Sequence, residues 1–222
     1  HTNAIYGFLN ILFKILDEEQ PEYLTVTFDV HAPTFRHEMY PEYKGTRKPM
    51  AEELRQQVPV IKEVLQAMNI ATIEKAGLEA DDLLGTISHS CEEKGMDVAI
   101  ISGDRDTLQL ATEHVKIRIP KTKQGRTEIE DYFASDVKEK YGVTPTEFID
   151  VKALMGDTAD NIPGVPGIGE KTATKIIVEY GNIENAHEHV SELKPPRASK
   201  NLDEFWDQAV LSLSLIHISE PT

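Results

Sequence analysis

Carboxylates in four short clusters are the side chains of this sequence best suited to chemistry. They are Asp29; Glu79, Asp81 and Asp82; Asp104 and Asp106; and Asp157 and Asp160. Carboxylates brought together without basic partners repel one another, and a hard divalent cation removes that conflict. Oxygen ligands suit Mg²⁺ or Mn²⁺, and two such ions about 4 Å apart can hold the attacking and leaving oxygens of a phosphodiester. The chemistry indicated is metal-assisted hydrolysis.

Each cluster alone also has an ordinary structural explanation. Acids at the start of a helix, as at Glu79 to Asp82, complement the helix dipole. An aspartate after a strand is commonly a turn former or a helix cap. Asp157 and Asp160 could be solvated loop carboxylates. The four clusters together are hard to explain in this way, so the metal site is favoured.

The elements that must position these acids alternate between strands and helices. The apolar run at 97–102 predicts a strand buried on both faces, and residues 23–28 alternate as a strand does. Asp29 and Asp104 follow these two strands, and the carboxyl ends of parallel strands line one crevice. Short strands are expected at 115–119 and 127–129, around a basic turn at 121–126. Helical spacing predicts helices over 2–16, 51–68, 79–94, 145–155 and 170–180. The fold class is α/β with a parallel sheet.

A glycine-rich segment, G-V-P-G-I-G-E-K-T, runs from Gly164 to Thr172. It is not a P-loop, because Glu170 stands where the lysine should be and a helix, not a strand, precedes it. A helix–hairpin–helix is favoured, in which glycines allow close backbone approach and the next helix binds a phosphate through its N–H groups. Lys171 and Lys175 add charge there. A simple turn between helices is the alternative.

Bulk properties neither demand nor exclude a nucleic-acid partner. The net charge of the 222 residues is −15, but without the eight candidate ligands 30 acids face 23 basic residues, a remainder of −7. The single Cys91 excludes an internal disulfide and fits a reducing compartment. No apolar run reaches the roughly 20 residues of a membrane span, and no export signal is seen. A cytoplasmic protein is expected.

Ordered motifs identify a family. F-D-V-H-A-P-T-F-R-H-E, Y-K-G-T-R, E-A-D-D, S-G-D-R-D-T-L-Q-L and M-G-D-T-A-D-N-I-P-G-V-P-G-I-G-E-K-T-A occur in this order. They closely resemble the 5′-nucleases of the flap-endonuclease superfamily, to which the 5′-nuclease domain of bacterial DNA polymerase I belongs. The likeness runs from about residue 2 to about residue 210. It implies a parallel-sheet nuclease domain of the PIN/resolvase-like kind, with a C-terminal helix–hairpin–helix subdomain.

The resemblance also assigns roles. It implies that all eight acids are ligands of two or more Mg²⁺ or Mn²⁺ ions, and that K⁺ binds at the hairpin. Arg36 and Lys44 become the catalytic basic residues of an arch at 31–50 that receives the 5′ strand. The implied DNA-binding residues are Arg47, Lys48, Gly164, Gly167, Gly169, Lys171, Thr172 and Lys175. Tyr40 and Tyr43 could stack on bases or simply pack.

The implied organisation has three parts. Residues 1–143 form the α/β core with the arch, 144–210 the hairpin subdomain, and 211–222 a non-native tail resembling translated sequencing adaptor, to which we assign no function. The family begins with a strand that ends in another ligand aspartate, and this sequence has none. We therefore expect a fragment, cut at both ends, that aggregates and cleaves poorly.

The expected partner is DNA with a 5′ flap, a nick or a free 5′ end, bound by a monomer in the bacterial nucleoid. Whether a polymerase domain follows, or the exonuclease stands alone, is left open. Two rivals remain. One is a phosphatase using Asp-x-Asp-x-Thr, although Thr107 comes one position early and His31 stands where the second aspartate should be. The other is a non-catalytic, structure-specific DNA-binding module.

Overall fold

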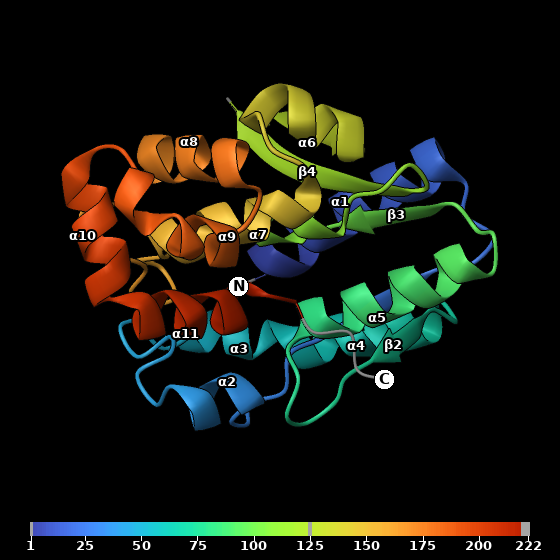
Figure 1. The fold of residues 1–222 in the computed structure, drawn as a ribbon. Helices are drawn as coiled ribbons and strands as arrows, with labels where there is room; N and C mark the ends of the chain where they lie inside the picture. Colours follow the sequence, from blue (N-terminus) through green and yellow to red (C-terminus); the bar gives the residue numbers. More distant parts are fainter. Residues whose placement is uncertain (1, 124–125, 219–222) are drawn as a thin grey trace.

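The computed structural model describes residues 2–123 and 126–218. The middle of the basic turn expected at 121–126 and the last four residues of the expected tail lie outside the described residues. Helices carry most of the described chain, and the strands lie between them (Figure 1). None of the described helices is long and apolar enough to cross a membrane.

The N-terminal part pairs two helices with a two-stranded parallel sheet. Helix α1 (Asn3–Glu19) packs on α4 (Gln57–Ala67) through a cluster that includes Leu12, Ile61 and Leu65, the last fully buried. Strand β1 (Thr25–Thr27) is parallel to β2 (Ala71–Ile73), with Thr25 opposite Ala71. The apolar residues of α1 recur at helical spacing and form a stripe along one face, and this face packs on α4.

A second sheet holds the main core. Strand β3 (Val98–Ile101) is parallel to β4 (Val115–Lys123), which is antiparallel to β5 (Arg126–Tyr132). Helix α5 (Ala80–Glu93) leads into β3, the 3₁₀ helix η1 (Arg105–Leu110) follows it, and α6 (Ala134–Tyr141) follows β5. Within the described residues the two sheets remain separate, so β1 and β3 each have one edge without a partner strand.

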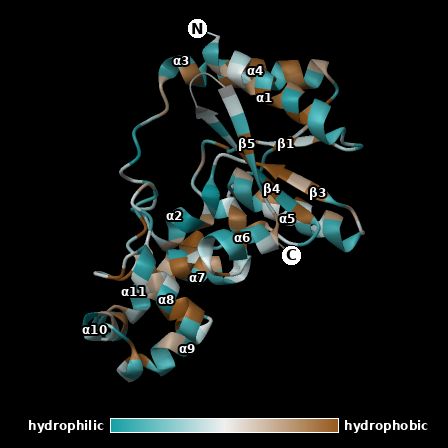
Figure 2. Ribbon diagram, turned by 90° about the horizontal axis from the view of Figure 1, so that it is seen from above, coloured by the Kyte–Doolittle hydropathy of each residue, from teal (hydrophilic) through white to brown (hydrophobic). Residues whose placement is uncertain are grey.

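The C-terminal part is helical and lies at one end of the molecule (Figures 1 and 2). It comprises α7 (Pro145–Met155), α8 (Glu170–Tyr180), α9 (Ile183–Glu188), the 3₁₀ helix η2 (Val190–Glu192), α10 (Pro196–Glu204) and α11 (Trp206–Ile216). Thr144 caps α7 in a capping box with Glu147, and Pro145 supplies the preset backbone of its first turn. The main core cluster continues from the sheet into these helices, so both parts share one interior.

The α/β class with a parallel sheet and the five expected helices are confirmed, with differences in detail. The arch contains a short helix, α2 (Phe35–Met39), and the expected helix at 51–68 is divided into α3 (Glu52–Arg55) and α4. Strand β2 and helices α6, α9, α10 and α11 were not predicted. Residues 211–216 of the expected tail continue α11, and Leu215, Ile216 and Ile218 are buried, because leucines at helical spacing after Trp206 meet the core.

Candidate metal and nucleic-acid site

The first group of acids lies where β1 ends and α5 begins. Asp29 follows β1, and its Oδ1 accepts a hydrogen bond of 2.7 Å from the backbone N–H of Ala80. That N–H belongs to the first turn of α5, whose N-cap is Glu79 and whose next acid is Asp81. Three of the predicted ligands are thus brought together by one strand end and one helix start.

Asp81 and Asp104 extend this group across to the second sheet. Burial, together with the neighbouring charges of Asp104, Asp29 and Glu79, raises the pKa of the Asp81 carboxyl to about 7. Asp104 follows β3 and caps η1 by accepting a 2.9 Å hydrogen bond from the Asp106 N–H. Burial is the largest cause of this shift and the surrounding negative charge adds to it; a divalent cation bound there would relieve the repulsion among these carboxylates.

A second group joins η1 to the end of α7 through a lysine. Lys152 Nζ lies 3.1 Å from Asp106 Oδ1 and 2.6 Å from Asp157 Oδ2. Burial raises the pKa of Asp106 to about 6. Lys152 opposes this shift, and the charge of Asp104 adds to it. Burial would also raise the pKa of Asp157, but the hydrogen bond and charge of Lys152 hold it below its usual value. Sequence reasoning missed Lys152, whose only signal was its place one turn before Asp157.

Three side chains from the second half of the arch, Tyr43, Lys44 and Arg47, contact Glu79 and Asp160. Lys44 Nζ lies 2.5 Å from Glu79 Oε1 and 4.0 Å from Asp160 Oδ2, and Arg47 forms an ion pair with Asp160. Tyr43 is buried, and its hydroxyl donates to Glu79 Oε2 at 3.0 Å. Because that hydroxyl and ring are enclosed, the structure supports the packing interpretation of Tyr43 over stacking on a base.

Arg36 and Asp82, predicted as a catalytic residue and a metal ligand, are paired with each other below the open cluster. Their side chains are 3% and 0% exposed, and the guanidinium makes two hydrogen bonds to the Asp82 carboxylate, of 2.8 and 2.9 Å. In this arrangement the Arg36 guanidinium is bound to a carboxylate and is closed off from solvent. The physical reason is charge: a fully buried carboxylate needs a partner, and Arg36 supplies it.

The types of residue present fit a divalent cation, although their side chains do not converge on one point as the ligands of a bound ion would. Within 2–123 and 126–218, no three carboxylates or other ligands form a ready-made metal site. Basic side chains explain this, since Lys44, Arg47 and Lys152 stand between the acids. Among the described residues Asp29, Asp81 and Asp104 form no ion pair with these basic side chains, and carboxylate oxygens are the donors that Mg²⁺ and Mn²⁺ prefer.

The hairpin between α7 and α8 has the expected apolar base. Ile168 is 3% exposed and belongs to the main core cluster, while Gly167, Gly169, Lys171 and Lys175 are exposed. Gly167 has a positive φ of 77°, whereas Gly169 is the N-cap of α8 with φ −93° and open space where a Cβ would stand. Gly169 therefore allows approach without needing glycine's backbone freedom. Thr172 is half-buried in the first turn of α8.

Gly164 has a packing role that sequence reasoning missed. It is buried, and a Cβ there would lie 2.4 Å from the backbone nitrogen of Gly156. Its N–H donates to Ser212 Oγ at 3.0 Å, so it is not free to bind a phosphate. The two glycines close the loop that carries Asp157 and Asp160.

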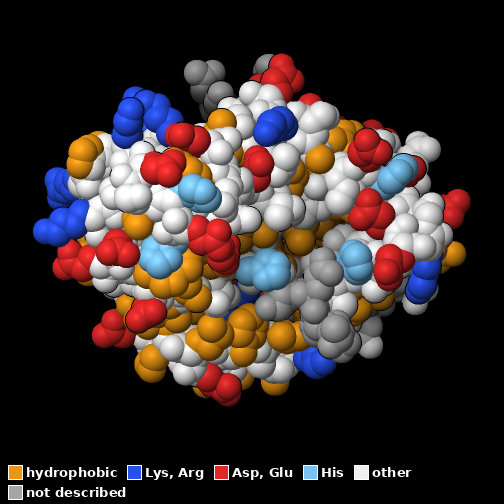
Figure 3. Space-filling view, in the orientation of Figure 1, with side chains coloured by type: hydrophobic (Ala, Val, Ile, Leu, Met, Phe, Trp, Pro, Cys, Tyr) orange, Lys and Arg blue, Asp and Glu red, His pale blue; other side chains and the backbone are white. Residues whose placement is uncertain are grey.

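Positive side chains gather at the end of the molecule formed by α8 and α10, on the left of Figure 3. The exposed basic residues of these helices are Lys171, Lys175, Arg197 and Lys200. Lys48 is exposed in the arch. The surface next to the hairpin is thus locally basic despite the net charge of −15.

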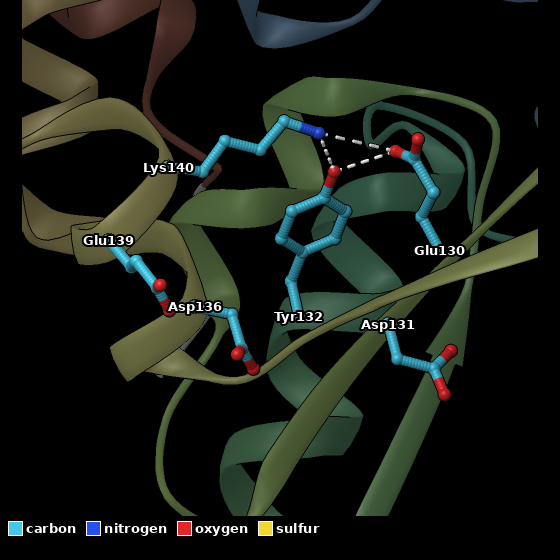
Figure 4. A pocket seen from close by; sticks show the side chains of 6 residues that line it. All are labelled: Glu130, Asp131, Tyr132, Asp136, Glu139 and Lys140. Carbon is cyan, nitrogen blue, oxygen red and sulfur yellow. Dashed lines mark hydrogen bonds and ion pairs between the residues drawn. The ribbon is translucent and has the colours of Figure 1, made fainter.

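A depression of about 500 Å³ lies elsewhere, at β5 and α6 (Figure 4). Glu130, Asp131, Asp136 and Glu139 line it with Tyr132 and Lys140, and Lys140 and Tyr132 turn toward Glu130. None of the predicted site residues lines it. Its acids are solvated or already paired, so it offers no second centre.

The fold and the acid cluster define a class, the resolvase-like nucleases with a helical C-terminal domain. The sequence matches the 5′-3′ exonuclease N-terminal resolvase-like domain over residues 1–142 and the 5′-3′ exonuclease C-terminal SAM fold over residues 143–222. The chain belongs to the 5′-3′ exonuclease family. The resemblance drawn from the motifs is thereby confirmed.

Relatives and solved structures agree. The chain is 47% identical over 218 residues to DNA polymerase I of Bacillus caldotenax and 46% identical to that of Bacillus subtilis, covering 98% of this chain but 25% and 24% of the relatives. It spans about a quarter of their length. A zinc-bound T5 5′-exonuclease matches with a TM-score of 0.77 and 27% identity, covering 95% of this chain and 80% of that one. The catalytic core of Rad2 with DNA, at 18% identity and a TM-score of 0.61, shares the fold.

Proposed function

We propose that this chain hydrolyses DNA phosphodiesters from a 5′ end or at a 5′ flap, using Mg²⁺ or Mn²⁺, and leaves 5′-phosphate products. The observation that carries the proposal is the group formed by Asp29, Asp81 and Asp104 at adjoining strand and helix ends, where the Asp29 carboxylate accepts the N–H of Ala80. Burial and the charges of Asp104, Asp29 and Glu79 raise the pKa of Asp81 there to about 7. A related solved structure supports it: a bacteriophage T5 flap endonuclease was crystallised with DNA and metal ions.

The roles of the side chains follow from their positions. Asp29, Glu79, Asp81 and Asp104 would hold one part of the metal site, and Asp106, Asp157 and Asp160 the other. When bound, the divalent ions supply an activated water and offset charge on the phosphoryl group. Lys44, which pairs with Glu79 in the structure, would stabilise charge on the phosphoryl oxygens. Arg47 and Lys48 would guide the strand.

The hairpin would hold the duplex away from the reacting phosphate. The N–H groups at the start of α8 are exposed at Gly169, with Lys171, Thr172 and Lys175 in the next turns. The K⁺ expected at the hairpin would be bound by backbone carbonyl oxygens. Two carbonyls of the hairpin already accept hydrogen bonds from side-chain amides: that of Pro166 from Asn201, and that of Gly164 from Gln208. Duplex affinity measured in KCl and in tetramethylammonium chloride tests that ion.

The wider setting is also a proposal. We infer that the chain acts as a monomer in the bacterial nucleoid. We also infer that a polymerase region like that of its full-length relatives follows it in the complete protein. Both come from likeness to DNA polymerase I, of which the chain matches a quarter.

A nuclease assay tests the function. A DNA duplex with a 5′-labelled flap is incubated with the chain and Mn²⁺, or with EDTA, and products are tested for a 5′ phosphate. Metal-dependent cleavage with 5′-phosphate products supports the proposal. Tight duplex binding without cleavage would favour the DNA-binding module, and a phospho-aspartyl intermediate with a small phosphate ester would favour the phosphatase.

A further inference from the structure

Arg36 is the most completely bonded basic side chain in the described part of the molecule. Its Nη1 and Nη2 donate to Asp82 at 2.8 and 2.9 Å, and Nη1 lies 3.3 Å from Glu79 Oε2. Its Nε donates to the backbone oxygen of Leu215, and Nη2 to that of His217, both at 2.9 Å. The residue is 2% exposed. Every direction of the planar fork is used within the protein.

Asp82 transmits this contact to the predicted ligands. It is the third residue of α5, and its Oδ2 accepts the backbone N–H of Glu79 at 3.0 Å, closing the capping box of the helix. The backbone that Asp82 fixes carries Glu79 and Asp81, on either side of Ala80, whose N–H holds Asp29. The orientation of the helix start depends on Asp82, and the charge of Asp82 depends on Arg36.

The other end of the contact is the last turn of α11. The carbonyls of Leu215 and His217 are among those a helix leaves without internal partners, and an arginine there also complements the helix dipole. These are backbone oxygens, so the contact does not depend on which side chains stand at 215 and 217. Helix α11 packs along α7, which ends just before Asp157.

We propose that Arg36 is a positioning residue that aligns the two halves of the metal site, and that it does not touch the DNA. It ties the base of the arch to the start of α5, which bears Glu79 and Asp81, and to α11, which supports the helix leading to Asp157 and Asp160. The inference rests on the proposed function for the identity of the site. Outer contacts of this kind typically change metal affinity or activity 10- to 100-fold when removed.

The decisive test is a double substitution in the 222-residue chain. Arg36→Met leaves a buried charge on Asp82, and its melting temperature in EDTA is expected to fall by roughly 10 °C. Its affinity for Mn²⁺, measured by calorimetry, should fall at least about 10-fold. Arg36→Met with Asp82→Asn removes that charge and keeps an oxygen for the Glu79 N–H. The double variant should regain most of the Mn²⁺ affinity and fold even if the single variant does not.

Two further variants sharpen the comparison. Arg36→Lys keeps the charge but cannot span Asp82 and two carbonyls, so its Mn²⁺ affinity should also fall. Arg55→Met is the matched control, because Arg55 is 71% exposed and pairs only with Glu52 on the same helix; it should change neither quantity.

Flap cleavage at saturating Mn²⁺ separates positioning from contact with the substrate. The double variant should cleave within about 10-fold of the parent if Arg36 only aligns the site. Unchanged Mn²⁺ affinity in Arg36→Lys, or a double variant that is saturated with Mn²⁺ yet at least 100-fold slower, would overturn the inference. A parent that binds Mn²⁺ but cuts no DNA would count against the proposed function alone, since the affinities still decide the role of Arg36.

Discussion

At the scale of single residues, the site is a balance of charge. Lys44 and Lys152 each contact two of the predicted ligands, whereas within residues 2–123 and 126–218 Asp29, Asp81 and Asp104 form no ion pair with a lysine or arginine. Acids with a lysine beside them are already neutralised before a metal binds. The unneutralised acids should therefore dominate metal affinity and turnover.

Asp104 is the residue for which this difference should be largest. Asp104→Asn is expected to lower the cleavage rate at least roughly 100-fold while DNA binding survives, because a carboxylate that holds the ions acts on the transition state. We predict this for a version of the chain in which the family's first strand is present. Single-turnover rates and duplex affinity would be compared at saturating Mg²⁺, and near-normal cleavage there would remove Asp104 from the site.

The lysines of the arch and of the hairpin should have separable effects. Lys44 contacts the carboxylate of Glu79, whereas Lys171 is an exposed residue in the first turn of α8. Lys44→Ala should slow single-turnover cleavage far more than Lys171→Ala, which should mainly weaken duplex binding. If about five phosphates are contacted, affinity should fall roughly 100- to 1,000-fold between about 50 and 200 mM salt. Equal loss of single-turnover rate in both variants would contradict this division.

At the scale of elements, helix ends position the functional groups. The capping boxes of α5 and α7 fix the backbone on which Glu79 and Asp81 stand and the helix that leads to Asp157. Asp150 does the same for α9, because its Oδ1 accepts the Ile183 N–H at 2.9 Å while the residue is 8% exposed. These contacts set the relative placement of the helices that carry the hairpin.

Asp150 should make stability depend on pH. Burial, with a smaller contribution from Glu184, raises its pKa to about 6, although the Ile183 N–H opposes the shift. The pKa of Asp150 is higher in the folded than in the unfolded chain. Its contribution to the free energy of unfolding is therefore complete below about pH 4 and is lost as the pH rises through about 6, a loss of up to about 3 kcal/mol. Asp150→Asn keeps the cap and lacks the charge. Its melting temperature should exceed the parent's at pH 8 and approach it at pH 4; the same difference at both pH values would refute this.

The hairpin should act through its backbone. Gly169→Val keeps an allowed φ of −93° and fills open space, so the melting temperature should stay within about 2 °C of the parent while duplex affinity falls. Gly167→Val is the contrasting variant, because its φ of 77° strains any valine. Neither the parent nor the variants should bind ATP. Unaltered duplex affinity in Gly169→Val would exclude the start of α8 as a phosphate site.

At the scale of the whole molecule, two sheets and a helical end share the site. Strands β1 and β3 each have an unpaired edge within the described residues, and both precede predicted ligands. Unpaired edges leave backbone groups without partners and favour aggregation. The stability of the α/β part should therefore respond to any segment that pairs with them.

An added N-terminal segment with a family-like strand and its aspartate should test this. We expect the extended chain to melt cooperatively at a higher temperature than the 222-residue chain and to cleave a 5′-labelled flap faster. A strand carrying asparagine in place of that aspartate is the control, which should restore folding without full activity. A cooperative melt with full activity in the shorter chain would show that the strand is dispensable.

Local patterns predicted most of the fold, and tertiary pairing accounts for what they missed. Asp29 and Asp104 could be placed because strand ends are visible in apolar runs, and the hairpin because glycine and proline mark turns. The pairing of Arg36 could not be predicted, since an exposed arginine and one paired with a buried Asp82 look alike in sequence. Helix α10 was missed because its residues are largely polar and only Ala198 and Leu202 are buried.

The contact between Gly156 and Gly164 makes the intervening acidic segment a closed ring. Side chains other than hydrogen are excluded at both closing positions, since Cβ atoms there would lie 2.4 to 2.8 Å from backbone atoms. Insertions within 157–163 would separate the closing glycines, whereas substitution at the exposed Thr158 and Ala159 would not. For protein engineering, the residues between Gly156 and Gly164 can be substituted as one segment, provided that its length and both glycines are kept. Libraries that vary metal preference could be built inside it without redesigning either flanking helix.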